Sequence, residues 1–157
     1  MEAVPSHPSE PPDVQVFRYQ RPAFPEGRGK GVQLLGRTDL AFAAIQRLSA
    51  TGGETNLHTH ANVDGFWMVL TGRVRFYTTD DVVIADLGPM EGIVVPRGYP
   101  YWFGAVGEES EIIQFEANVR RQRADTKHDT GRIDIGARRA NQIQRPARTR
   151  EEVAGEA

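Results

Sequence analysis

The chain has 157 residues, a length that suits a single domain with a hydrophobic core. It contains no cysteine, which excludes disulfides, thiolate metal sites and cysteine nucleophiles. The net charge of −2 provides no general attraction for nucleic acid. No apolar run is as long as a membrane span, and the first residues lack the pattern of a signal peptide, so we expect a cytoplasmic protein without a membrane partner.

The first third of the chain predicts loops followed by short strands. Residues 1–13 are rich in proline and are expected to form a disordered leader. A short strand is possible over 14–18, and the Pro- and Gly-rich segment 21–31 is predicted to be a loop. Residues 41–48 have a composition that also suits a helix. Their short length and the Thr-Gly-Gly turn that follows favour a strand, with a helix as the alternative.

The middle of the chain alternates short apolar runs with turns. The chain has 16 glycines and 10 prolines, and many of them stand between these runs, which is typical of an all-β protein. The expected strands are 66–70, 73–77, 82–87, 93–95, 99–103 and 111–117. Strands of this length and spacing predict a jelly-roll barrel, a double-stranded β-helix, over residues 14–119.

The segment 120–157 differs in composition from the barrel. Arginine is frequent in it and apolar residues are sparse, so we predict a solvated tail or an arm laid across a partner subunit. Residues 132–135 could form a docking strand. Acidic residues stand among the arginines, and nucleic acid is therefore not the expected partner.

The most informative motif is His58-Thr59-His60. Side chains at alternate positions of a strand point to the same face and lie about 6–7 Å apart along the chain. Two neutral imidazoles at that spacing can bind one divalent metal. A polar surface strand with two unrelated histidines is the alternative.

The surrounding residues make this segment similar to the cupin superfamily. In that family a glycine is followed by five residues, His-x-His, three or four residues, a glutamate, six residues and a glycine. Here Gly52, His58, His60 and Gly72 match that order. A second motif, Pro-x-Gly followed by a histidine, resembles Pro96-Arg97-Gly98, and the resemblance covers residues 40 to 117. It implies a barrel, a homodimer and one divalent transition metal: Fe, Mn, Ni, Cu or Zn.

Two positions depart from the family pattern. Gly65 stands where the family has its glutamate, and Tyr101 stands where it has a third histidine. Asp64 could replace the carboxylate, which would give a two-histidine, one-carboxylate site formed by His58, His60 and Asp64. The strand register set by Gly72 would instead turn Asp64 outward, unless a bulge re-aims it.

Other residues are candidates for the pocket. Tyr101 could hydrogen-bond a substrate and is a candidate catalytic residue, although packing is an equal alternative. Trp67, Phe103 and Gln114 are candidate substrate contacts, with core packing as the alternative for Trp67. Glu54 and Glu116 are two further carboxylates that could reach the barrel mouth.

The resemblance leads to a small metal-binding cupin, predicted to be a metal-dependent enzyme acting on a small organic molecule. Dioxygenases, isomerases, cyclases and lyases all fall in this class. The alternative is a non-enzymatic cupin that binds or senses a small ligand through a degenerate metal site. A third possibility is an interaction protein in which the barrel is a scaffold and the arginine-rich tail acts.

Overall fold

The computed structural model describes residues 12–123 and 127–138. They form an all-β fold of ten strands and one short 3-10 turn, η1 (Thr79–Asp81). The strands are β1 (Lys30–Arg37), β2 (Ala41–Leu48), β3 (Gly53–His60), β4 (Val63–Thr71), β5 (Val74–Tyr77), β6 (Val83–Leu87), β7 (Gly92–Val95), β8 (Tyr101–Ala105), β9 (Ser110–Asn118) and β10 (Arg132–Arg138). Within this part of the chain, no helix has the length and hydropathy needed to cross a membrane.

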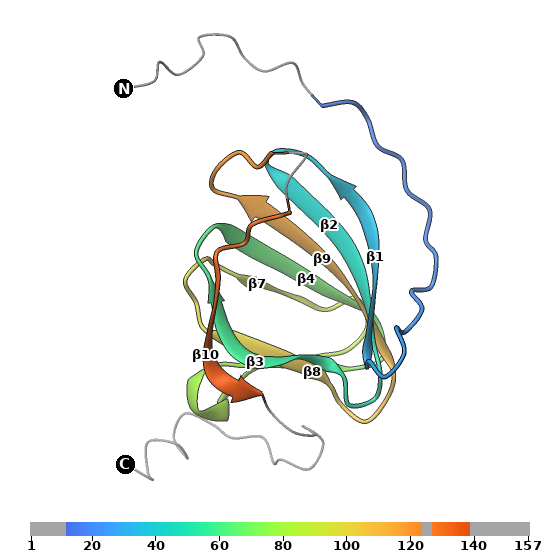
Figure 1. Ribbon diagram of the computed structural model, residues 1–157. Helices are drawn as coiled ribbons and strands as arrows, with labels where there is room; N and C mark the ends of the chain where they lie inside the picture. Colours follow the sequence, from blue (N-terminus) through green and yellow to red (C-terminus); the bar gives the residue numbers. More distant parts are fainter. Residues whose placement is uncertain (1–11, 124–126, 139–157) are drawn as a thin grey trace.

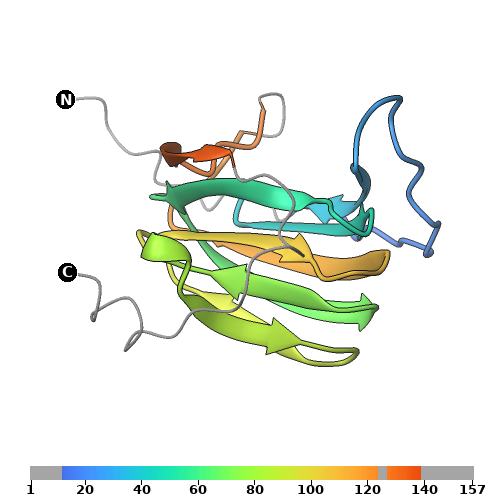
Figure 2. The same cartoon turned by 90° about the horizontal axis from the view of Figure 1, so that it is seen from below.

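Two antiparallel five-stranded sheets face each other (Figure 1). One has the order β1-β2-β9-β4-β7, and the other has the order β10-β3-β8-β5-β6. Figure 2 shows the second sheet with its strands side by side and β10 at one edge. This arrangement confirms the jelly roll predicted from the sequence.

Strand pairing shows that residues 41–48, for which a helix was the alternative, form a strand. Residues Ala41–Leu48 form β2, which pairs with β1 on one side and along its whole length with β9 on the other. A central strand satisfies its backbone groups through both neighbours, which outweighs the helix propensity of its alanines.

The segment predicted as a strand over 14–18 is extended but forms no ladder. Hydrogen bonds from side chains, and not backbone pairing, attach this segment to the outer side of β1. Gln15 bonds the backbone of Arg37 in both directions, and Gln33 does the same with Arg18 and Gln20. Figure 1 shows this segment passing outside β1.

Part of the predicted tail belongs to the barrel. β10 pairs with β3, with Arg132 opposite His60 and Asp134 opposite His58. The suggested docking strand 132–135 is thus an edge strand of its own sheet. The residues before 12 and after 138, including most of the predicted leader and tail, lie outside the described part of the chain.

The interior between the sheets is apolar at one end and polar at the other. Along the inner face of β9 the side chains change from Ile112 to Gln114 and Glu116, and β2 changes from Leu48 to Gln46 in the same direction. The apolar core consists of Leu48, Trp67, Val69, Val74, Phe76, Leu87, Val95, Tyr101, Phe103, Ala105 and Ile112. The polar end is where a ligand would meet hydrogen-bonding groups.

Candidate functional site

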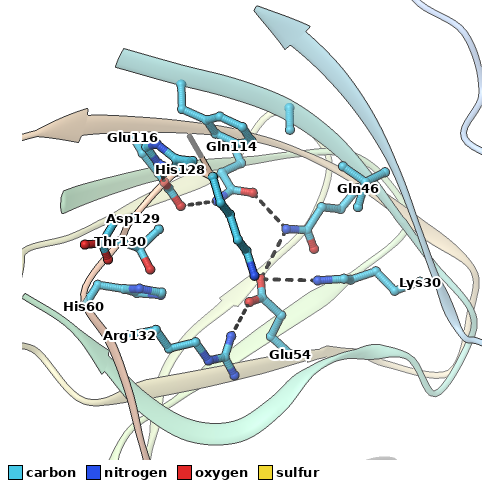
Figure 3. Close-up of a pocket in the computed structure, with 14 residues that line it drawn as sticks. Lys30, Gln46, Glu54, His60, Gln114, Glu116, His128, Asp129, Thr130 and Arg132 are labelled. Atoms are coloured by element: carbon cyan, nitrogen blue, oxygen red, sulfur yellow. Dashed lines mark hydrogen bonds and ion pairs between the residues drawn. The ribbon is translucent and has the colours of Figure 1, made fainter. Parts of the chain in front are cut away.

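A cavity of about 610 Å³ opens at the polar end of the barrel (Figure 3). Both sheets and the segment that leads into β10 contribute to its wall. The lining residues are Lys30, Val32, Phe42, Ala44, Gln46, Glu54, His60, Gln114, Glu116, Lys127, His128, Asp129, Thr130 and Arg132. Cavities of this size hold small organic molecules.

A chain of hydrogen bonds crosses the wall formed by β2 and β9. Gln46 donates through Nε2 to Gln114 Oε1 at 2.8 Å and to Glu54 Oε2 at 3.2 Å. Gln114 in turn donates through Nε2 to Glu116 Oε1. The other carboxylate oxygen of Glu116 lies 2.6 Å from His128 Nε2. The structure therefore places Gln114, one of the predicted pocket residues, at the centre of the cavity wall.

Glu54 is the carboxylate at one end of this series of hydrogen bonds. Arg132 donates to its Oε1 at 2.9 Å, and the Lys30 ammonium lies 4.0 Å from its Oε2. Burial alone would raise the pKa of the Glu54 carboxyl, but Lys30, His58, Gln46 and Arg132 together hold the pKa below its ordinary value. The group is thus a carboxylate that is already matched by cations.

His58 and His60 lie on one face of β3, as the motif predicted. Their ring centroids are 4.9 Å apart in an edge-to-face arrangement. His58 Nδ1 lies 2.6 Å from the carbonyl oxygen of Asn56, so Nδ1 carries the proton and donates it. The Nε2 of His58 and the Nδ1 of His60 are buried, and neither has a hydrogen-bond partner in the described part of the chain.

Both imidazoles are neutral at pH 7. Burial lowers the pKa of His58. Burial and the neighbouring His58 lower the pKa of His60 to about 4. The pair therefore presents nitrogen lone pairs rather than positive charge to its surroundings.

Tyr101 lies against this pair. Its ring centroid is 4.5 Å from that of His58 and 5.8 Å from that of His60. Burial, and then the charges of Glu54 and Glu116, raise the pKa of the Tyr101 phenol well above its ordinary value. The phenol is thus a hydrogen-bonding group that keeps its proton.

The structure places two predicted pocket residues in the core. Trp67 and Phe103 are buried below the histidines, with ring centroids 4.8 Å apart. Neither lines the cavity of 610 Å³. Both point inward from the middle of their strands, opposite Gln114 on β9 and Glu54 on β3, and they are enclosed by the apolar core cluster.

Asp64 is the predicted ligand that the structure does not bring to the histidines. Val63, Gly65 and Trp67 of β4 are buried, and Asp64 alternates with them. Its Oδ1 accepts from the Arg97 backbone at 2.8 Å, and its Oδ2 accepts from the Arg97 guanidinium at 3.0 Å. The parity of the strand, without a bulge at this point, turns the carboxylate outward.

Gly65 has no side chain that could supply the missing carboxylate. A Cβ atom at Gly65 would lie 3.1 Å from Nε1 of Trp67, a tight contact that the indole would have to relieve. The cross-strand partner of Gly65 on β9 is Glu116, which shares a small recess with His60 and Tyr101.

The sequence model described as Cupin matches residues 34–132, which is more than half of the chain. The chain belongs to the cupin family. This confirms the resemblance that His58, His60, Gly72 and the Pro96–Gly98 turn indicated. No curated protein matches this cupin in sequence.

Several solved structures share its fold. A cupin-like protein from Thermotoga maritima is 14% identical with a TM-score of 0.59, and the alignment covers 87% of this chain and 94% of that one. An RmlC-like cupin from Shewanella frigidimarina is 16% identical with a TM-score of 0.57, covering 72% and 96%. KdgF from Halomonas sp. is 18% identical with a TM-score of 0.54, covering 64% and 88%. At these identities the likeness shows the fold alone.

The donor set of this cupin does not fit the metal site that the resemblance implies. His58 and His60 offer two imidazole nitrogens, but a stable site of this kind needs at least three protein ligands. Across residues 12–123 and 127–138, no three side chains of the metal-ligating types come together. Gly65, the indole of Trp67 and the phenol of Tyr101 stand where further ligands would be needed.

Two functional candidates, His128 and Arg132, are not predictable from the sequence pattern. His128 approaches the cavity from the segment after the last predicted strand, and Arg132 reaches it from β10. Neither residue stands in a motif or in a periodic pattern. Glu54 and Glu116, predicted as carboxylates within reach of the barrel mouth, both line the cavity, and the alternation of Glu116 with Ile112 and Gln114 is the signal that it faces inward.

Replacing Asp64 with alanine is expected to have little effect. Its ion pair with Arg97 is on the surface, and such pairs contribute about 0–1 kcal/mol. We expect the free energy of unfolding, measured with urea, to fall by less than about 1 kcal/mol. Metal content should equal that of the wild type. A loss of bound metal in this variant would restore Asp64 as a ligand.

Proposed function

We propose that this cupin binds a small polar organic molecule in the barrel cavity through its hydrogen-bonding wall, without requiring a metal. The observation that supports the proposal most is the connected chain from His128 through Glu116, Gln114 and Gln46 to Glu54. Buried polar side chains cost free energy unless they are bonded. A wall of them, held in fixed geometry around a cavity of 610 Å³, suits the recognition of a polar ligand.

The unpaired and charged groups of the cavity wall indicate the chemistry of that ligand. Gln46 Oε1 is buried without a partner in the described residues and would accept from a hydroxyl or amide. Lys30 and Arg132 place positive charge beside Glu54, which Gln46 also contacts. A small molecule with a hydroxyl or amide donor and a carbonyl or carboxylate oxygen would suit these groups.

Gln114→Leu tests this proposal. The substitution keeps the approximate volume but removes the bonds to Glu116 and Gln46, which leaves buried polar groups unpaired. Losses of about 1–3 kcal/mol are typical in such cases, so binding should weaken at least about fivefold. Ligand-observed NMR in a buffer with chelator first identifies a compound that binds, from a set of small hydroxy acids, keto acids, sugars and amides. The affinity of that compound is then measured for the wild type and for Gln114→Leu.

Gln20→Leu is the matched control, because Gln20 is exposed and lies outside the cavity. It should bind the probe as the wild type does. Circular dichroism of both variants checks that the barrel is intact. If no compound of the four classes binds, or if Gln114→Leu binds as well as the wild type, the proposal is wrong.

The histidine pair favours a second candidate, the metal-dependent enzyme predicted from the sequence. His58 is held by Asn56 in the tautomer whose Nε2 lone pair is free, which is how metal-binding histidines are commonly oriented. Two protein ligands make a weak site, so one divalent transition metal would depend on a chelating substrate. Metal identity stays a prediction.

The remaining expectations about partners and location are also predictions. The family implies a homodimer, and Phe66, Val94 and Phe115 are exposed apolar residues on neighbouring strands of the first sheet. Light scattering of the full chain measures the oligomeric state. A cytoplasmic location and the absence of nucleic-acid and membrane partners rest on composition alone.

A further inference from the structure

An apolar shelf lies beside the polar wall of the cavity, on the first sheet. The shelf consists of Val32 and Leu34 of β1 and Phe42 and Ala44 of β2. Val32 lies opposite Gln46, and Leu34 lies opposite Ala44. Directly paired residues of an antiparallel ladder point to the same face of the sheet. Since Gln46 and Ala44 line the cavity, Val32 and Leu34 are also on the inner face.

Two residues of the shelf are exposed although they face inward. The exposed fractions are 53% for Val32 and 59% for Leu34. On the same inner face, Leu48 and Ile112 are fully buried in the core. β1 is an edge strand, and edge strands commonly carry charged side chains at exposed positions. Here two aliphatic side chains stand beside the cavity instead.

The shelf runs alongside the hydrogen-bonding side chains of the wall. Ala44 pairs with Gln114 across β2 and β9, and Phe42 pairs with Glu116. One face of the Phe42 ring is covered by the imidazole of His128, with ring centroids 4.7 Å apart. The cavity thus has a hydrocarbon side on β1 and β2 and a polar side on β2 and β9.

We propose that the ligand of this cavity has an apolar body, such as a phenyl ring or a branched hydrocarbon chain, which lies on the shelf while its hydroxyl or amide group bonds the wall. The inference rests on the proposed binding function and narrows its ligand class. Apolar surface is stabilised when it leaves water, so Val32 and Leu34 contribute affinity in proportion to the apolar area that the ligand covers. These two side chains are therefore specificity-determining residues.

The same geometry disfavours sugars. A sugar ring carries hydroxyl groups around its whole edge, and those that face the shelf would lose their bonds to water without gaining a partner. A compound with polar groups at one end only avoids that cost. The expected ligand is an amphipathic hydroxy acid or amide rather than a carbohydrate.

The test compares two pairs of probes that share a polar end and differ in the apolar body: phenyllactate with lactate, and phenylacetamide with acetamide. Glucose is the carbohydrate probe. Dissociation constants are measured by ligand-observed NMR on the full chain, in a buffer with chelator. Half of the stabilisation from fully burying a phenyl group corresponds to a factor of about ten. At least one phenyl compound should therefore bind, and bind at least about tenfold more tightly than its truncated partner.

Val32→Thr keeps the shape of the side chain and replaces a methyl group with a hydroxyl. It should weaken binding of the phenyl compound about threefold and leave binding of the truncated partner unchanged. Val94→Thr is the matched control, because Val94 is 57% exposed on β7, the other edge strand of this sheet, and does not line the cavity. It should leave both affinities unchanged.

Leu34→Gln is the second variant and should weaken binding of the phenyl compound at least as much. Light scattering of this variant shows whether a second copy of the chain covers the shelf. A change of oligomeric state without weaker probe binding would overturn the inference.

Equal effects of Val32→Thr and Val94→Thr, or binding of glucose or a truncated probe as tight as that of the phenyl compounds, overturn the inference alone. The same holds if neither phenyl compound binds while another screened compound does. If no hydroxy acid, keto acid, sugar or amide binds, the proposed function fails as well, so the two failures are distinguishable.

Discussion

Acidification from pH 7 to pH 4 is expected to lower the free energy of unfolding by about 3 kcal/mol through His60 alone. The pKa of this residue is about 4 in the folded protein, against an ordinary value of 6.5. Between these pH values the unfolded chain binds a proton at His60 that the native protein does not. Protons therefore favour the unfolded chain, and stability is lost as the pH falls through this window.

Other groups act in the same range, and Glu54, whose pKa neighbouring cations hold below its ordinary value, adds to the loss of stability. The pKa of His58 is lowered by burial, so its effect has the same sign as that of His60. The pKa of Glu116 is raised by burial, so the native protein binds that proton first and the effect opposes the loss. The contribution of His60 is therefore read as a difference between the wild type and His60→Asn.

Urea unfolding followed by tryptophan fluorescence at pH 7, 5.5 and 4 gives this difference. The wild type should lose more stability than His60→Asn over the same interval, by about 3 kcal/mol. Only the pH dependence is compared, so a constant cost of the substitution cancels. Equal pH dependence in the two proteins would show that His60 is not a buried neutral imidazole.

Restoring the family ligands should convert the barrel into a metal-binding protein. The variant combines Gly65→Glu and Tyr101→His with Trp67→Val, because the Trp67 indole lies 3.1 Å from the position of a Cβ at Gly65. With His58 and His60 it offers three imidazoles and a carboxylate. Four such ligands suit a divalent transition metal.

Elemental mass spectrometry measures the result after removal of metal with chelator and dialysis against zinc or manganese. We expect near one equivalent in the combined variant and well below one in the wild type. Trp67→Val alone is the control and should resemble the wild type. Metal should also raise the melting temperature of the combined variant only. A full equivalent in the wild type would favour the metal-dependent enzyme over the proposed function.

The sequence predicted the fold because the fold is encoded locally. Turn residues bound each short strand, and the two cupin motifs mark the strands that carry the histidines. Local sequence does not decide between a strand and a helix over 41–48. The pairing of this segment with β1 and β9 excludes the helix. For Asp64, the register counted from Gly72 already indicated an outward side chain, and the structure agrees.

The candidate site could be predicted only in part. His58, His60 and Tyr101 come from motifs, and the structure brings their rings together. His128 and Arg132 reach the cavity from a segment whose path depends on the pairing of β10 with β3. Such long-range pairing leaves no periodic signal in a chain segment of mostly polar residues. The position of Trp67 against Gly65 is likewise a matter of packing that spacing alone does not show.

Calorimetric titration of the cavity ligand in excess chelator, and again after addition of manganese or zinc, tests the central claim most directly. The claim is that side chains of the wall, and not a metal, hold the ligand. We predict equal affinity in the two conditions for the wild type and at least about fivefold weaker binding for Gln114→Leu in both. Binding that occurs only with added metal and is lost in His58→Ala would contradict it.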